Sequence, residues 1–196
     1  DGGSEEADPL PGVKVKAYDD TVLLNLAGSL SAAGSIGAVA TVVTLVFNKE
    51  VTAETGATDV ITCPGKVEVL AHANDDLILL AVAFGAGAST GVAGGANALV
   101  FQNHVTAALG GSIGTEDNRV LAVKVVADTN STLVNVAAAA GLGGTVGAAG
   151  VAVVTYFYNE TLAYVKDGTY VKDGTYVKNG SKIYAAGSVE ILASSK

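Results

Sequence analysis

Three long segments of the chain align with one another without a gap, and this repeat constrains the fold more than any other feature. The segments are residues 23–53, 77–107 and 133–163. Such a period is typical of repeat architectures, in which neighbouring units cover one another's apolar faces. Four kinds of anchor keep the same offsets of 54 and then 56 residues: Leu23, Leu77 and Leu133; Gly37, Gly91 and Gly147; Phe47, Phe101 and Phe157; Ala53, Ala107 and Ala163.

A shorter alternating element precedes each long segment at the same offsets. It reads VKVKA at 13–17, VEVLA at 67–71 and VKVVA at 123–127, and a fourth copy, VEILA, occupies 189–193. The predicted organisation is an N-terminal extension, three repeat units and the first strand of a fourth unit. Their ranges are 1–12, 13–66, 67–122, 123–188 and 189–196.

The apolar pattern within a unit favours β-strands. In residues 77–89 side chains alternate with a period of two, and one phase consists mainly of Ala and Gly, which suits a strand packed closely on one face. Glycine-bearing turns follow at 34–37, 88–91 and 144–147. We therefore predict an all-β repeat fold, a β-solenoid or β-helix-like stack. It has three units of about 55 residues, each with one short and two long strands.

Three uncharged stretches support an alternative interpretation. Residues 21–48, 77–103 and 129–159 carry no charged side chain, and each exceeds the ~20 residues that span a bilayer as a helix. In this alternative interpretation, the chain is an integral membrane protein that is built from Gly/Ala-rich helices or forms a β-barrel segment. Acidic flanks and mid-segment glycines, each costing a helix ~1 kcal/mol, oppose this alternative. We expect strands and no membrane insertion.

The composition excludes one class of partner. The net charge is −8 and Arg119 is the single arginine, whereas nucleic-acid binding needs clustered Lys and Arg. The chain is 49% hydrophobic with 25 glycines and 6% aromatic residues, so its apolar side chains are mostly small. This balance favours closely approaching sheets.

The repeat unit resembles a known group of proteins. A Gly/Ala-rich apolar stretch leads into Phe-Asn-x-x-Val-Thr-Ala at 47–53, and a short Val-x-Val-x-Ala strand follows. This pattern, between Val13 and Ala193, resembles repeats of large bacterial surface and secreted adhesins, the filamentous-haemagglutinin-like and leukotoxin-type exoproteins. The resemblance implies a β-solenoid shaft, an extracellular or cell-surface location and a structural or adhesive role. It implies no catalytic residues.

The residues that could carry chemistry are few. His72, His104 and Cys63 lack the spacing of a metal site, and no catalytic motif is present. We predict no enzymatic activity, no cofactor and no metal. Acidic residues recur after the short strands, where we expect solvated turns, with a stacked calcium site as the alternative. These residues are Asp19, Asp20, Asp75, Asp76 and Asp128.

The hexapeptide Val-Lys-Asp-Gly-Thr-Tyr occurs twice within residues 165–182, and a third, altered copy follows. Taken alone, this period matches left-handed parallel β-helices. However, the connection to the next short strand is 14 residues in unit one, 16 in unit two and 26 in unit three. The hexapeptides are therefore interpreted as an insertion within the last connection, forming an extra hairpin or partial coil through Asp-Gly and Asn-Gly turns.

The two ends of the array have matching patterns. An open stack exposes a strand edge at each end, and such edges recruit other chains. We therefore expect a structural subunit of an extracellular fibre or adhesin shaft that assembles with itself, head to tail, into a homopolymer. The sequence names no host or cell-surface ligand. The predicted interface residues are Val13, Val15, Val189, Ile191, Val165, Val171 and Val177.

Overall fold

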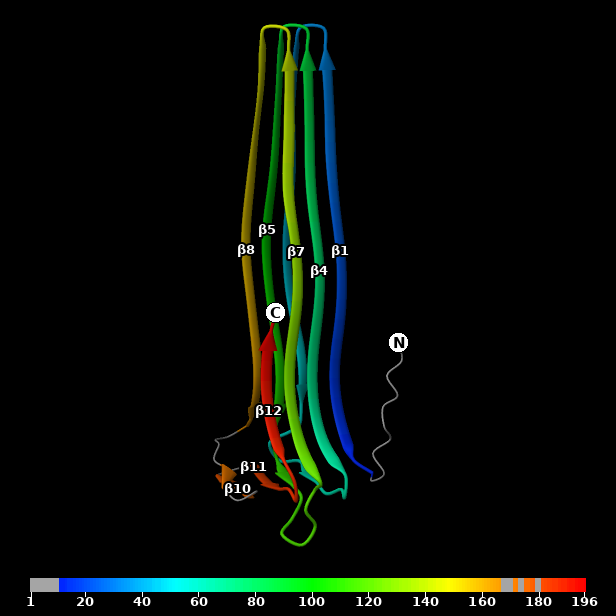
Figure 1. Ribbon diagram of the computed structural model, residues 1–196, viewed down its shortest axis with the longest axis vertical. Helices are drawn as coiled ribbons and strands as arrows, with labels where there is room; N and C mark the ends of the chain where they lie inside the picture. Colours follow the sequence, from blue (N-terminus) through cyan, green and yellow to red (C-terminus); the bar gives the residue numbers. More distant parts are fainter. Residues whose placement is uncertain (1–10, 167–170, 173–174, 179–180) are drawn as a thin grey trace.

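The computed structural model describes residues 11–166, 171–172, 175–178 and 181–196 of the chain. It is an all-β stack, which confirms the predicted fold class, and its strands form three sheets. Figure 1 shows the long strands running nearly parallel, with the turns between them gathered at one end of the molecule. We call this end distal. The opposite end, which we call proximal, carries β10 (Thr175–Lys178), β11 (Ser181–Tyr184) and β12 (Val189–Ser195).

The two large sheets are parallel throughout. The first sheet has the order β1-β4-β7-β12 and the second β2-β5-β8. Each turn carries the chain from the first sheet to the second, so β1 with β2 forms the first rung, β4 with β5 the second, and β7 with β8 the third. The bounds are Val13–Ala33, Lys66–Gly87, Ala122–Gly143 and Val189–Ser195 for the first sheet, and Ile36–Glu54, Thr90–Leu109 and Val146–Val165 for the second.

The register of the ladders confirms the sequence alignment. Leu23 lies opposite Leu77 and Leu77 opposite Leu133 in the first sheet. The glycine, phenylalanine and alanine anchors lie opposite their counterparts in the second sheet. The three phenylalanine rings stack, with centroids 5.6 Å apart between Phe47 and Phe101 and 4.9 Å apart between Phe101 and Phe157. The repeat therefore places equivalent side chains directly above one another.

The short strand of each unit lies elsewhere than predicted. Residues 13–17, 67–71 and 123–127 are the beginnings of the long strands β1, β4 and β7 rather than separate elements. The short strand of each unit instead lies in the connection that follows the second long strand. These strands are β3 Val60–Ile61, β6 Ser112–Ile113 and β11 Ser181–Tyr184.

The helical interpretation of the uncharged stretches is wrong. Residues 21–48, 77–103 and 129–159 form strands joined by two-residue bends, and the described residues contain no helix. Alternating side chains point between the two sheets, where close approach requires small residues. A Cβ atom on Gly91 would overlap the backbone carbonyl oxygen of Leu142. This contact explains a glycine at the start of β5.

A third sheet closes the proximal end. Its order is β3-β6-β11-β10-β9, with β10 at Thr175–Lys178 and β9 at Val171–Lys172. Ile61, Ile113 and Ile183 are paired across β3, β6 and β11 and pack on the proximal core, in which Ile113 and Ile183 are buried. The predicted hairpin of the insertion is present, because β10 pairs antiparallel with β11. The insertion residues 167–170, 173–174 and 179–180 lie outside the described residues.

Substitution of Phe101 tests whether the stacked phenylalanine rings contribute to the stability of the core. The Phe101 side chain is fully buried between two other rings, whereas Phe157 is 40% exposed in the end rung. Replacing Phe101 with Ala is expected to lower the free energy of unfolding by about 3–5 kcal/mol, through lost burial and the cavity left behind. The matched Phe157→Ala variant should lose clearly less. Denaturant unfolding of both variants measures the difference, and equal losses would contradict the described register.

Candidate functional site

The predicted acidic turns are not turns. Asp19 and Asp20 lie within β1, Asp75 and Asp76 within β4, and Asp128 within β7. Asp and Asn favour turns in general, but here the ladder on both sides holds the backbone extended. Consecutive acids consequently point to opposite faces of the sheet, and the predicted pairs are split between the interior and the surface.

The acids also do not stack on one another. Asp20 lies opposite Asn74, which lies opposite Asn130. The amides form a chain in which Asn130 Nδ2 donates to Asn74 Oδ1 at 2.9 Å and Asn74 Nδ2 donates to Asp20 Oδ1 at 3.0 Å. No group of three or more His, Cys, Asp or Glu residues that could hold a metal ion occurs among the described residues. The row is therefore a hydrogen-bonded ladder with one carboxylate at its end.

The most distinctive polar group lies inside the stack. Lys49 of β2 is 8% exposed, and Asp75 of β4 is fully buried. Lys49 Nζ lies 2.6 Å from Asp75 Oδ1 and 3.0 Å from Asp19 Oδ1, so one ammonium joins the two sheets and the first two rungs. Asn103 Nδ2 donates to Asp75 Oδ2 at 3.0 Å, and the Ser131 hydroxyl donates to the same oxygen at 3.3 Å.

This buried cluster favours one register of the two sheets. A buried carboxylate without its cation is strongly unfavourable, so slipping one sheet against the other by two residues would be costly. Apolar rows of Val and Ala offer no such discrimination, because a slipped row still meets apolar neighbours. The Lys49 cluster therefore specifies how the two sheets align.

The neighbours of Asp19 in the cluster lower the pKa of its carboxyl group. The Thr21 hydroxyl donates to Asp19 Oδ1 at 2.7 Å, and this hydrogen bond is the largest cause that lowers the pKa of Asp19 below its usual value. Partial burial acts in the opposite direction. The hydrogen bond and the charge of Lys49 lower the pKa further.

The two histidines lie on the outer surfaces of the middle rung. His72 stacks on the Tyr18 ring with centroids 5.2 Å apart, and its Nδ1 atom lies 3.1 Å from Asp128 Oδ2. These residues line a groove of about 390 Å³ on the first sheet, and Leu70 and Val126 also belong to its lining. On the second sheet, His104 Nδ1 lies 2.9 Å from Glu160 Oε2. Both histidines thus pair with a carboxylate of the third rung.

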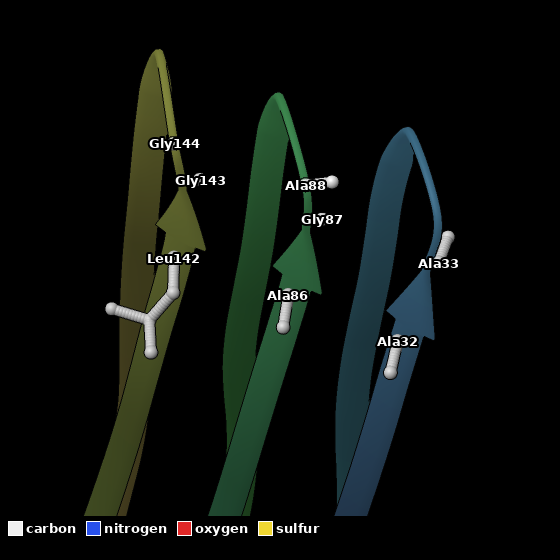
Figure 2. A pocket seen from close by; sticks show the side chains of 8 residues that line it. All are labelled: Ala32, Ala33, Ala86, Gly87, Ala88, Leu142, Gly143 and Gly144. Atoms are coloured by element: carbon white, nitrogen blue, oxygen red, sulfur yellow. The ribbon is translucent and has the colours of Figure 1, made fainter.

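A second groove, of about 430 Å³, lies at the distal turns. Figure 2 shows its lining, in which Leu142 is the largest side chain and the others are alanine or glycine. Backbone groups there bond from rung to rung, as where Ser89 N donates to Ser35 O at 3.0 Å. A lining of this kind offers shape and backbone atoms but no acid, base or nucleophile. The lining residues are Ala32, Ala33, Ala86, Gly87, Ala88, Leu142, Gly143 and Gly144.

The predicted interface residues fall into three groups. Val13, Val15 and Val189 face the proximal core and are half-buried, and Ile191 is 39% exposed. Val165 is only 5% exposed within that core, which leaves almost no surface for a partner. Val171 and Val177 lie in β9 and β10, and their side chains lie outside the described residues.

Sequence reasoning missed Lys49. Its position in the aligned segments is shared with Asn103 and Asn159, and it has the same parity as the inward Phe47 and Val51. The sequence does contain a signal for this site, because Lys49 is a charged residue in an alternating row whose neighbours Phe47 and Val51 are apolar. Its partner Asp75 comes from the opposite sheet, and only the fold brings these two residues together.

The comparisons with known proteins add no family. No protein family, curated protein or solved structure matches the chain. Within the described ranges, no helix has the length and apolarity needed to cross a membrane.

Removing the cation of the buried cluster should be strongly destabilising. In Lys49→Met the carboxylate of Asp75 stays buried without its ion pair, and we expect a loss of about 3–5 kcal/mol in unfolding free energy. The matched control is Lys14→Met, which removes a partly exposed ion pair to Glu68 and should cost at most about 1 kcal/mol. Denaturant unfolding compares the two variants. Similar losses would contradict the proposed role of the cluster.

Asp19 is expected to contribute to the free energy of unfolding at neutral pH and to lose this contribution in acid. Because its folded pKa is lowered, its contribution is complete above the unfolded pKa of about 3.9 and disappears as the pH falls through the lower folded value. Asp19→Asn should therefore show a smaller loss of unfolding free energy than wild type between about pH 6 and about pH 2.5, two values chosen to bracket that window. Denaturant unfolding at both pH values measures the loss of unfolding free energy in each protein. Equal losses in Asp19→Asn and wild type would contradict the prediction.

Proposed function

We propose that the protein is a non-enzymatic structural unit of an extracellular fibre or surface adhesin shaft. It assembles with itself, head to tail, through its terminal strands. The repeated strands supply length and stiffness, since β4 has 22 residues and spans about 70 Å at ~3.3 Å per residue. The extracellular or cell-surface location is part of the proposal and is supported by the resemblance of the repeats to bacterial surface adhesins.

The observation that carries the proposal is the incomplete cover of the end rungs. Phe101 in the middle rung is fully buried, whereas the equivalent Phe157 is 40% exposed although it also faces the interior. At the other end, Leu23 and Phe47 face the interior and are only partly buried. A further rung at either end would bury these side chains and pair the strand edges that have no neighbouring strand among the described residues, and such edges are templates for added strands.

A second candidate function is membrane association, which the outer faces of the distal half favour. Leu24, Leu26 and Leu30 are 61%, 60% and 74% exposed on the first sheet, and Val42 and Val46 are 68% and 70% exposed on the second. Apolar surface of this extent marks an interaction site. However, each unpaired backbone group on a strand edge costs several kcal/mol in lipid. We therefore favour the fibre, in which the edges are paired.

The proposed function predicts fibres of defined dimensions. Concentrated protein in detergent-free buffer should form fibres about 70 Å wide, with strands perpendicular to the fibre axis and a reflection at about 4.8 Å along it. Electron microscopy and fibre diffraction measure these features. A protein that stays monomeric at all concentrations would contradict the proposal, and binding to lipid vesicles by that monomer would favour the second candidate.

A further inference from the structure

The Lys49 cluster holds an amine against a carboxyl group in the interior of the stack. Lys49 Nζ lies 2.6 Å from Asp75 Oδ1, and the exposed fractions of the two side chains are 5% and 0%. Ala73 and Leu77, the neighbours of Asp75 on the same face of β4, are fully buried as well. The Cγ atom of Asp75 is one covalent bond beyond Oδ1, so a nucleophilic nitrogen is held beside the carbon that it could attack.

The two oxygens of Asp75 have different partners. Oδ1 faces the Lys49 ammonium group. Oδ2 accepts a hydrogen bond from Asn103 Nδ2 at 3.0 Å and a second one from the Ser131 hydroxyl at 3.3 Å. Donors in this arrangement stabilise the negative charge that develops on a carbonyl oxygen when a nucleophile adds to its carbon. Oδ2 is therefore placed to remain as a carbonyl oxygen, and Oδ1 is placed to leave.

A second carboxylate contacts the same nitrogen. Asp19 Oδ1 lies 3.0 Å from Lys49 Nζ, and the Thr21 hydroxyl holds that oxygen at 2.7 Å. This hydrogen bond is the largest cause of the lowered pKa of Asp19, so its carboxyl group is ionised at neutral pH. A carboxylate within hydrogen-bond distance of a reacting nitrogen is able to accept its proton and to return it later in the reaction.

We propose that Lys49 and Asp75 condense into an isopeptide bond between Nζ and Cγ, with Asp19 as the proton carrier. The bond is a modification within one chain, so it goes beyond the proposed function and does not depend on assembly. It joins β2 to β4, and thereby links the two sheets and the first two rungs covalently. Burial favours the product, because it excludes the water that would hydrolyse the bond.

The reaction balances without a further reactant. One proton passes from Nζ to Oδ1, which replaces the buried ion pair by a neutral amine and a neutral acid and removes two charges from the interior. The electron pair of Nζ then forms a bond to Cγ, the carbonyl electron pair moves onto Oδ2, and Asp19 accepts a second proton from Nζ. Asp19 returns this proton to the Oδ1 hydroxyl, which leaves as water while the carbonyl bond to Oδ2 re-forms.

Mass spectrometry tests the inference. The full chain is made by cell-free synthesis, and its intact mass is measured in denaturing solvent at intervals after synthesis. The wild-type chain should lose the mass of one water molecule. Trypsin, which cleaves after unmodified Lys and Arg, should then yield residues 17–66 joined to residues 67–119. Fragmentation of this branched peptide should place the link at Lys49 and Asp75, which distinguishes it from water loss elsewhere in the chain.

Asp19→Asn removes the proton carrier and keeps both reacting side chains. The bond should therefore form at least about a hundredfold more slowly than in wild type. Asp20→Asn is the matched control, because it makes the same change at the next residue, where the side chain contacts Asn74 rather than Lys49. This control should form the bond at the wild-type rate. Circular dichroism establishes that each chain is folded before the rates are compared.

The wild-type mass decides the inference even where a variant fails to fold. A folded wild-type chain that keeps its full mass, or that loses water at another position, would overturn the inference without affecting the proposed fibre. Bond formation at the wild-type rate in folded Asp19→Asn would overturn the role of Asp19. Fibre formation is measured separately, so the two proposals fail independently.

Discussion

The parallel, in-register hydrogen-bond ladder between successive rungs holds the stack together and fixes which side chains meet. Because the chain repeats at the offsets of the ladder, each side chain lies beside its counterpart from the next unit. Stacking of like on like is favourable for apolar groups, as the three phenylalanine rings show with centroids 4.9 and 5.6 Å apart. It is unfavourable for charges, which would repel along the whole stack.

The distribution of charge follows from this constraint. Outer charges alternate in sign between strands, and both histidines lie beside a carboxylate of the next rung. Inside, Lys49 is a charged exception in a position where the other rungs carry asparagine. Its contacts with Asp19 and Asp75 make it a register device specific to one rung. The polar chemistry of the protein thus discriminates between strands and alignments.

The two ends of the stack differ for a physical reason. At the proximal end three sheets enclose the core, and Ile113 is fully buried there. At the distal end only two sheets meet, so the interior narrows to small residues, and glycine is needed where backbones approach, as at Gly91. Polar selectivity is concentrated proximally, whereas the distal half contributes length and apolar surface.

The repeat, its register and the positions of the three turns follow from the order of the residues alone. Anchors of different types at one spacing admit a single alignment, and glycine-bearing turns interrupt the alternation. The sequence did not reveal that Asp19 and Asp20 lie mid-strand, because local turn preference is weaker than a ladder formed on both sides. The pairing of Lys49 with Asp75 was decided by tertiary structure. Those two residues belong to different sheets, and only their face-to-face packing removes both from water.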